Sequence, residues 1–468
     1  MKTPCGRLTV FVPGLGIAII FLVLALHYPL VFAANWDIQT VDFEGDVGQF
    51  TSLALDTLGF PHISYHDVTN RNLKYAFRDE DGWHIETVDS LGDVEIWGSL
   101  TSLALDARGF PHIAYCCDSD LKYAYQDSSG WRIQLVSGMN GWGASLVLDP
   151  SGFPHISHGM DWGTCVYSYK NSSGWNHEII PDGCIAELST SLALDAIRKP
   201  HVTCVTMEGS DYSMEHAHKV AGSWETEIVE SCHTAGAGSS LLIDKSGILH
   251  ATHVLVGGSW SLRYAWKDIS GWQSQTIDQL DGWMEQWITS LVVDSQGALH
   301  VCYMGNGYDL VVQHQNGSEW ILETVDSEDQ VGMHPSMVMD SSDHPHISYY
   351  DITHDDLKYA RFLPNQFKLA ANLQNGQLLL TWEPVFGMSS YWVFGASQEP
   401  WFQPDLSAPT YVNRLAVIPA GITAWSTTNG IGDQSDNWTY LISAMDDSNL
   451  EWVRSNRVGE HDFDVMIP

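Results

Sequence analysis

One sequence pattern recurs seven times in this chain and restricts its fold more than any other feature. The pattern reads S-Φ-Φ-Φ-D-x-x-G-x-P-H-Φ-x-Y, where Φ is apolar, and continues with L-K-Y-A and then G-W-x-x-E-x-V-D. Its aspartate recurs as Asp56, Asp106, Asp149, Asp195, Asp244, Asp294 and Asp340, and its histidine as His62, His112, His155, His201, His250, His300 and His346. Self-similarity at spacings of 43 to 50 residues indicates a repeat architecture, in which each unit packs against its neighbours.

Each copy contains four short strand-like runs separated by turn residues. In the first copy these runs are 52–55, 62–65, 73–77 and 83–88. Four strands per period of about 40–50 residues is typical of a propeller blade. The sequence therefore predicts an all-β fold, a seven-bladed β-propeller with four-stranded blades.

The tryptophan of the fourth strand predicts how the ring closes. It occurs six times inside the copies, as Trp83, Trp131, Trp175, Trp224, Trp272 and Trp320. The seventh copy ends without a fourth strand, and Trp36 lies 47 residues before Trp83. We therefore expect residues 36–42 to complete blade seven, which would remove two open sheet edges.

The first 33 residues have the features of an export signal. Lys2 and Arg7 precede an apolar run at 8–26, and Val31-Phe32-Ala33 offers a cleavage site. An uncleaved N-terminal anchor is the alternative, because the apolar run is long. We expect a mature chain that is secreted or lies at the cell surface or in the periplasm, where disulfides persist.

The repeat pattern ends near residue 363, and the C-terminal region has a different character. Strand-like runs at 378–382, 391–393 and 440–444 alternate with turn-rich segments, which is typical of a β-sandwich. The region resembles a fibronectin type III domain, with Trp382, Tyr391 and Tyr440 on its second, third and sixth strands. The expected organisation is a signal peptide at 1–33, a propeller at 34–363 and this sandwich at 364–468.

The charge balance excludes some partners. The chain has 57 acidic and 21 basic residues and a formal net charge of −36, so it repels phosphate backbones and anionic lipid. We expect no nucleic-acid partner and no membrane contact beyond the N-terminal segment. Histidines outside the repeat position have no spacing specific for ligands, and we predict no metal site and no cofactor. These histidines are His66, His158, His216, His218, His233, His253 and His334.

Serine, aspartate and histidine in every copy are the residue types of a nucleophilic triad. Seven near-identical copies instead indicate a structural role, because a triad needs one optimised copy. We expect the aspartate to cap the first turn through backbone amides, the histidine to bridge to that turn or to the next blade, and the tryptophans to pack between blades. No catalytic residue is predicted.

The repeat resembles those of the sialidase-like superfamily found in secreted bacterial proteins, over residues 35–362. In sialidases an aspartate motif has serine two residues before the aspartate, whereas here the two are four apart. The resemblance implies three channel-facing arginines that hold a carboxylate, but the propeller arginines here lie on turns and outer strands. Sialidase activity is therefore not expected.

The cysteines are expected to form two disulfides. In the antiparallel order the start of a third strand lies beside the end of the fourth, which favours Cys165–Cys184, and Cys204–Cys232 is the second expected pair. Each would close a loop worth about 3 kcal/mol in the chain-entropy account. Cys116 and Cys117 are either two free thiols or a strained vicinal disulfide.

The irregular loops before the first strands and between the second and third strands are the expected ligand site. They contain the tryptophans Trp97, Trp142, Trp162, Trp283 and Trp287, with acidic residues nearby. Aromatic rings stack on the apolar face of a sugar while carboxylates accept from its hydroxyls. The alternative is that these tryptophans only cap the central channel.

Three functions agree with this sequence. A binding or adhesion protein that recognises a carbohydrate or an extracellular protein is favoured. The alternatives are a glycan-active enzyme, a hydrolase or lyase that uses a carboxylate pair, and a structural component of the cell envelope. The fold itself supports all three.

Overall fold

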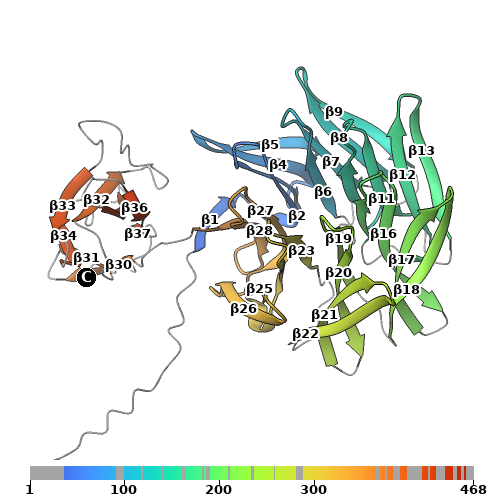
Figure 1. The fold of residues 1–468 in the computed structure, drawn as a ribbon. Coiled ribbons are helices and arrows are strands. Elements are labelled where there is room, and N and C mark those ends of the chain that lie inside the picture. The colour runs from blue at the N-terminus through green and yellow to red at the C-terminus, as the bar shows by residue number, and fades with distance from the viewer. Residues whose placement is uncertain are drawn as a thin grey trace, which may run out of the picture. The chain divides into compact units, whose positions relative to one another are not determined.

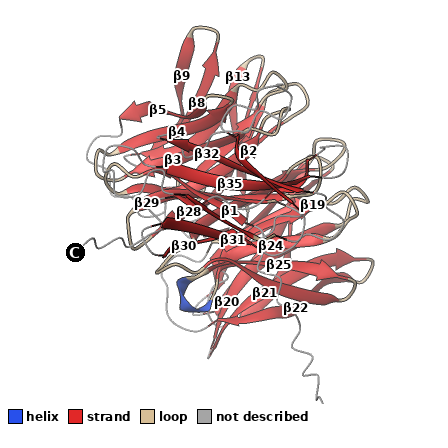
Figure 2. Ribbon diagram, turned by 90° about the vertical axis from the view of Figure 1, so that its left-hand side faces the viewer, coloured by secondary structure: helices blue, strands red, loops and turns tan. Residues whose placement is uncertain are grey.

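The computed structural model describes residues 36–90, 100–117, 120–138, 141–160, 164–181, 184–185, 190–208, 211–232, 237–257, 259–280, 288–363, 369–374, 377–382, 390–397, 414–419, 422–427, 438–445, 451–454 and 458–459. The expected leader at 1–33 lies outside these residues. The described chain consists of β-strands, turns and one short 3-10 turn at Asn306–Tyr308 (Figure 2). No helix in this described part is long and apolar enough to cross a membrane.

The first repeat forms a four-stranded antiparallel sheet. Its strands are β2 (Val47–Leu55), β3 (Pro61–Asp67), β4 (Asn72–Asp79) and β5 (Gly82–Ser90), paired in chain order. Two-residue alternation in these segments places one set of side chains against each neighbouring sheet. The turn between β2 and β3 needs Gly59, whose φ is +84°, a conformation that glycine adopts without strain.

The following repeats give five more sheets that are antiparallel in chain order (Figure 1). The second comprises β6 (Thr101–Leu105), β7 (Pro111–Cys117), β8 (Asp120–Asp127) and β9 (Gly130–Ser137), and the third β10 (Ser145–Leu148), β11 (Pro154–Gly159), β12 (Cys165–Asn171) and β13 (Gly174–Ile180). The fourth comprises β14 (Cys184–Ile185), β15 (Ser191–Leu194), β16 (Pro200–Glu208), β17 (Asp211–Val220) and β18 (Ser223–Cys232). The fifth comprises β19 (Ala237–Ile243), β20 (Leu249–Gly257), β21 (Ser259–Asp268) and β22 (Gly271–Leu280), and the sixth β23 (Ser290–Val293), β24 (Leu299–Met304), β25 (Leu310–Asn316) and β26 (Glu319–Asp326).

The last repeat shares its sheet with the first strand of the chain. Strands β27 (Met333–Met339), β28 (Pro345–Asp351) and β29 (Asp356–Phe362) pair in order, and β1 (Trp36–Asp42) pairs antiparallel with β29. In this register Trp36 lies opposite Phe362 and Ile38 opposite Ala360. The N-terminal strand therefore occupies the fourth-strand position that the last repeat lacks.

Neighbouring sheets pack through their inner strands. Strand β2 contacts both β6 and β27, and the series continues through β10, β15, β19 and β23. Each apolar cluster draws on two adjacent sheets; Leu73 and Tyr75 of one sheet pack with Leu103 and Tyr115 of the next. An all-β chain of four-stranded sheets packed side by side is consistent with a β-propeller.

The C-terminal region contains two further sheets. One consists of β30 (Leu369–Gln374), β31 (Gln377–Trp382) and β34 (Ala424–Thr427). The other contains β32 (Ser390–Ser397), β33 (Arg414–Pro419), β35 (Trp438–Met445), β36 (Glu451–Arg454) and β37 (Val458–Gly459). Trp382 of the first sheet and Tyr391 and Tyr440 of the second are buried in one shared core, so aromatic residues join the two sheets.

Candidate functional site

The repeat serine joins each sheet to the next one. The Ser52 hydroxyl accepts the backbone N–H of Leu103, and the same bond recurs at all seven copies at 2.9 to 3.1 Å. In the last copy, Ser336 accepts the N–H of Leu53 at 3.0 Å. The serine hydroxyl thus bonds a neighbouring strand and takes no part in a nucleophilic arrangement.

The repeat aspartate caps the turn between the first two strands, as expected. Asp56 Oδ1 accepts the backbone N–H groups of Leu58 and Phe60, at 2.9 and 2.8 Å. The same pair of bonds is present at the other six aspartates. At Asp106, burial opposes ionisation, but amide hydrogen bonds and Arg108 hold the carboxyl pKa below its usual value.

The repeat histidine bridges from this turn to the third strand of its own sheet. His155 Nδ1 hydrogen-bonds the hydroxyl of Tyr167 at 2.5 Å, and His300 Nε2 lies 3.3 Å from Asp294. Burial lowers the pKa of His112 to about 4, so this imidazole is neutral near pH 7. The structural interpretation of the Ser-Asp-His set is confirmed, because the three groups serve three different contacts.

The tryptophan of each outer strand packs against the preceding sheet, as predicted. The Trp131 ring meets Tyr75 edge-on at 5.3 Å, and its Nε1 donates to Glu86 at 2.8 Å. Trp83 contacts Tyr359 in the same way. Trp36 Nε1 donates to Glu323 of β26 at 2.7 Å. These rings connect the sheets at their outer strands.

Most of the predicted ligand tryptophans cannot be placed. Trp97, Trp162, Trp283 and Trp287 lie outside the described residues. Trp142 is described and is half-buried in the turn before β10. Its backbone carbonyl accepts the N–H of Gly159 at 2.8 Å, which holds this loop against the end of β11. The loops before the first strands and between the second and third strands define what we call the loop face. Trp142 is the described residue through which the predicted ligand site on this face can be tested.

The predicted disulfide pairs are corrected by the structure. Cys165 is a buried free thiol, packed among Ile180, Leu192 and Val202, and burial raises its pKa to about 12. The Cys165–Cys184 prediction is therefore wrong, because the residue opposite Cys165 on β13 is Ile180. Cys302 is also a buried free thiol, and Cys116 is buried and forms no disulfide.

Cys204 is disulfide-bonded, as predicted, but its predicted pairing with Cys232 disagrees with the strand order. Cys204 lies on β16 and Cys232 on β18, with β17 between them. Strands two apart in a sheet are about 9–10 Å from each other, which exceeds the Cα separation that a disulfide spans. The register instead places Cys184 opposite Thr206, two residues from Cys204. The side chains of Cys184 and Cys232 lie outside the description.

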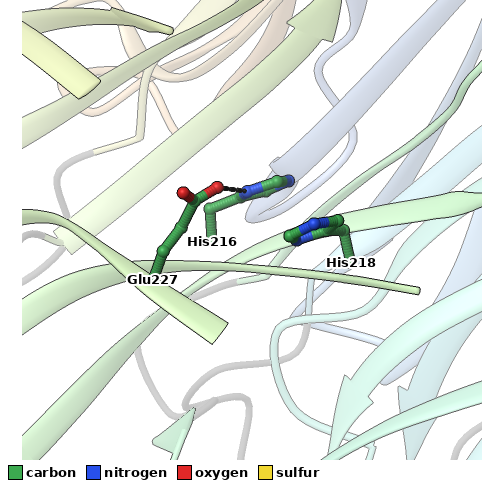
Figure 3. A group of neighbouring side chains, drawn as sticks. All are labelled: His216, His218 and Glu227. Atoms are coloured by element: carbon green, nitrogen blue, oxygen red, sulfur yellow. Dashed lines mark hydrogen bonds and ion pairs between the residues drawn. The ribbon is translucent and has the colours of Figure 1, made fainter. Parts of the chain in front are cut away.

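A cluster of imidazoles and a carboxylate, His216, His218 and Glu227, lies on β17 and β18 (Figure 3). One ligand-type atom from each of the three lies within 4.8 Å of the others. Glu227 accepts from His216 Nδ1 at 2.7 Å, and His216 Nε2 is 2.9 Å from Nδ1 of His201. Burial lowers the pKa of His216, whereas Glu227, although partly desolvated, has a pKa of about 2 because His216 and Lys267 stabilise its charge.

The sequence did not single out this cluster, because each histidine alone resembles many others. The signal that reveals it is the departure from the repeat. Position 216 corresponds to the tyrosine that bonds the repeat histidine in five other sheets, as at Tyr75 and Tyr123. Only an alignment of the copies by strand register shows the substitution.

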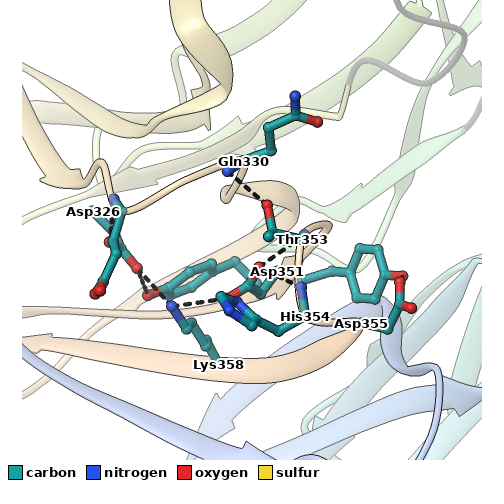
Figure 4. A network of polar contacts seen from close by, with 10 residues as sticks. Asp326, Gln330, Asp351, Thr353, His354, Asp355 and Lys358 are labelled. Atoms are coloured by element: carbon teal, nitrogen blue, oxygen red, sulfur yellow. Dashed lines mark hydrogen bonds and ion pairs between the residues drawn. The ribbon is translucent and has the colours of Figure 1, made fainter. Parts of the chain in front are cut away.

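A second polar network occupies the loop-face ends of β28 and β29 (Figure 4). Tyr349 donates to Asp326 at 2.6 Å, and Lys358 lies 2.9 Å from Asp351 and 3.5 Å from Asp326. Burial would lower the pKa of Lys358, but the two carboxylates raise it above its usual value. Asp351 also accepts two backbone N–H groups and pairs with His354.

The tyrosine-aspartate-lysine arrangement recurs in other sheets. Tyr65 and Lys74 both donate to Asp42, at 2.6 and 2.8 Å. Tyr115 and Lys122 both donate to Asp89, at 2.8 and 2.9 Å. Recurrence again indicates a structural role, which is to hold the second and third strands of one sheet to the fourth strand of the preceding sheet on this face.

Two bulged residues at the same end of the molecule depart from the repeat. Phe50 and His334 have φ of +56° and +53°, and each lies two residues before the serine of its inner strand. Gly143 and Gly238 hold this position with φ of +62° and +66° in two other copies. Left-handed backbone costs a residue with a side chain about 1–2 kcal/mol, so the strain at Phe50 and His334 is concentrated at the loop face.

The two strained residues stack on each other. Their ring centroids are 4.0 Å apart, and the Phe50 N–H donates to His334 Nδ1 at 3.1 Å. Both side chains are buried, and burial lowers the pKa of His334 to about 3. Nearby, Tyr350 donates to both Asp46 and Asp355, at 3.0 and 2.7 Å, and burial raises the pKa of Asp46.

No protein-family model matches the chain, and no curated protein matches it. Among solved structures, a Dos1 propeller is 9% identical, with 70% of this chain and 95% of that chain covered and a TM-score of 0.43. The Aleuria aurantia lectin in complex with Fucα1-6GlcNAc is 10% identical, with 60% and 96% covered and a TM-score of 0.42. A polysaccharide lyase described as an ulvan lyase is 13% identical, with 70% and 94% covered and a TM-score of 0.45. Likeness at this level carries no argument about function.

Proposed function

We propose that the protein is a secreted or cell-surface binding protein that recognises a carbohydrate or an extracellular protein. Its seven sheets form the blades of a closed propeller, and residues 364–468 form a fibronectin III-like spacer. The ligand site lies on the face that carries the loops before β2, β6, β10, β15, β19, β23 and β27.

The observation that carries this proposal is the use of the repeat residues. Serine, aspartate, histidine and tryptophan of the copies are all engaged in joining strands and sheets. The groups that the repeat does not require gather at the loop-face ends of the inner strands. Trp142 is one of them, since the same position holds Gln49 and Met333 in other copies. A half-buried ring at this face offers the stacking surface that a sugar or an apolar side chain needs.

Trp142→Ala tests the site. We expect the variant to bind its ligand about 5- to 150-fold more weakly, the equivalent of 1–3 kcal/mol for the loss of a large contact side chain. Its melting temperature should stay unchanged. The ligand is first identified on a glycan array and a panel of extracellular proteins. Trp131→Ala is the matched control, since this ring packs between sheets and its loss should lower stability. Normal binding by Trp142→Ala would refute this site.

A glycan-active enzyme is the second candidate, and one observation favours it. The Tyr350 hydroxyl lies between the carboxylates of Asp46 and Asp355, and a carboxyl with a raised pKa can act as a general acid. Any glycan that binds should therefore be assayed for turnover with wild-type protein and Asp46→Asn. Turnover that Asp46→Asn abolishes would replace the binding proposal with the enzyme. A protein with no ligand and no turnover would instead be a structural component.

A further inference from the structure

The fourth sheet departs from the repeat at two nearby positions. His216 replaces the repeat tyrosine, and His218 holds a position that is Phe77 or Tyr125 in other sheets. Glu227 lies opposite His216 across β17 and β18. Two imidazoles thus lie beside a carboxylate at positions where most other sheets carry aromatic rings.

Glu227 also does not accept the hydrogen bond that its repeat position accepts in other sheets. In five other sheets the side chain three residues after the outer-strand tryptophan accepts the Nε1–H of the next tryptophan, as Glu86 does for Trp131 and Glu178 for Trp224; Trp320 Nε1, next to the fifth sheet, has no acceptor among the described residues. Glu227 bonds His216 and Lys267 instead. As a result, Trp272 Nε1 is buried and has no acceptor among the described residues.

His218 supplies an independent observation. Its Nδ1 atom is buried and has no hydrogen-bond partner within the part of the chain that is described. A buried imidazole nitrogen without a partner is destabilising, and a bound metal ion would be a partner for this one. The three rings of His201, His216 and His218 lie nearly parallel, with neighbouring centroids 5.1 and 5.0 Å apart.

We propose that His216, His218 and Glu227 bind a divalent transition-metal ion of the zinc or copper class. Neutral imidazole and carboxylate are the donors that these ions accept in proteins, whereas calcium and magnesium require oxygen ligands. The His216 side chain is fully buried, while that of Glu227 is 31% exposed, so an ion can enter from the Glu227 side. Three protein ligands leave a fourth position for water or for an exogenous donor.

His201 supports the ligands from behind. Its Nδ1 faces His216 Nε2 at 2.9 Å, and its Nε2 is 3.8 Å from the turn aspartate Asp195. A ligating histidine that is oriented through its other nitrogen is the usual arrangement around protein metals. The bound ion would connect β17 to β18 beside the fifth sheet, where Trp272 packs on His216. This site does not depend on the proposed ligand face.

The test is metal binding by the full-length protein after treatment with a chelator. We expect wild-type protein to bind about one Zn²⁺ per chain by calorimetry and to show a Cu²⁺ electron paramagnetic resonance spectrum with coupling from two imidazole nitrogens. His216→Tyr restores the residue that five other sheets carry, so it should fold. Its zinc affinity should fall by at least about 100-fold, because loss of an outer-shell partner alone costs 10–100-fold.

Two further variants complete the test. Glu227→Gln should weaken zinc binding without changing the apo melting temperature much, and it serves if His216→Tyr does not fold. His314→Tyr is the matched control, since His314 stacks on the repeat histidine His300 but has no place in the cluster. It should bind zinc normally. The proposal is overturned if wild-type protein binds no zinc, if Ca²⁺ or Mg²⁺ competes equally, or if His216→Tyr and Glu227→Gln retain full affinity.

Discussion

At the scale of single residues, the repeat serine shows what a sequence pattern can and cannot reveal. Its recurrence predicted a structural role, because seven copies do not make one active site. The pattern could not show that the hydroxyl hydrogen-bonds the next sheet. A sequence repeat reveals which residue types recur, but it does not reveal which strands lie next to each other. The His216 cluster escaped prediction for the same reason. Its two histidines cannot be distinguished from the other histidines of the chain unless the copies are aligned by strand register.

Loss of one inter-sheet serine should measurably destabilise the protein. Ser52→Ala removes the acceptor for the N–H of Leu103, which leaves a part-buried donor without a partner. We expect the free energy of unfolding to fall by about 1–3 kcal/mol, measured by urea denaturation. Ser173→Ala on an exposed turn is the control and should change stability by less than about 0.5 kcal/mol. Equal values for the two variants would contradict the role of the serine.

The buried histidines predict a loss of stability in mild acid. Burial lowers the pKa of His112 to about 4 and also that of His346 to about 4, whereas an unfolded histidine titrates near 6.5. Between these pH values the unfolded chain binds protons that the folded chain does not. The contribution of these histidines to the free energy of unfolding is therefore fully present above about pH 6.5 and is lost as the pH decreases to about 4. Each such histidine contributes about 1–3 kcal/mol.

Urea unfolding at pH 7.0 and pH 4.5 measures this effect. His112→Gln should lower stability at pH 7.0, because the contact with Tyr123 is altered, but it should also reduce the difference between the two pH values. Carboxylates also begin to titrate at pH 4.5, but they do so in both proteins, so the comparison of the variant with wild type isolates the contribution of His112. If the variant showed the same difference in unfolding free energy between pH 7.0 and pH 4.5 as wild type, His112 would be protonated in the folded protein or would not contribute to the pH dependence.

At the scale of strands and loops, periodicity predicted the elements well and their ends poorly. The run at 52–55 is the C-terminal part of β2 and the run at 62–65 is the central part of β3. Strand β2 begins earlier than predicted, at Val47, because the preceding connection pairs with β3 through bulges. The bulges at Phe50 and His334 were not predictable, since neither residue favours a positive φ. The Cys165–Cys184 prediction failed at this scale too, and so did the choice of Cys232 as the partner of the disulfide-bonded Cys204, because pairing depends on strand order and register.

A glycine in these connections should be intolerant of any side chain. Gly48 has φ of +101°, and a Cβ there would lie 2.6 Å from the Cα of Leu357. Gly332 and Gly141, also four residues before the serine of their copies, approach Leu310 and Leu121 as closely. Gly48→Ala should therefore cost about 3–5 kcal/mol, from left-handed strain and a backbone clash together.

Gly59→Ala separates these two causes. Gly59 has φ of +84° but nothing within 4 Å of an added Cβ, so it should cost only the conformational strain of about 1–2 kcal/mol. Thermal unfolding of both variants gives the comparison. If the two glycines prove equally tolerant of alanine, the connection before β2 does not lie against the last repeat as the structure shows.

At the scale of the whole chain, stability should depend on a series of contacts that runs from each sheet to the next and leads back to the first sheet. The serine bonds proceed from sheet to sheet and end with Ser336 bonded to Leu53, and the tryptophan contacts end with Trp83 against Tyr359. The prediction of a closed ring came from the single displaced tryptophan at position 36, and the pairing of β1 with β29 agrees with it. Sequence reasoning could not reach the identity of a ligand, because the predicted tryptophans depart from the repeat, and the repeat gives no guidance where the copies differ; four of the five lie outside the described residues.

Removal of the first strand tests the ring as a whole. Deletion of residues 36–42 takes β1 from β29, removes the Trp36 contact with Glu323 and removes the Gln39 acceptor of Trp83. It thereby exposes β29 as an unpaired edge, and such edges promote aggregation. We expect the truncated protein to melt at a lower temperature or to aggregate, by differential scanning calorimetry and light scattering. Trp36→Ala keeps the strand and should cost about 3–5 kcal/mol without aggregation. A truncated protein that stays monomeric with an unchanged melting temperature would show that β1 does not close the propeller.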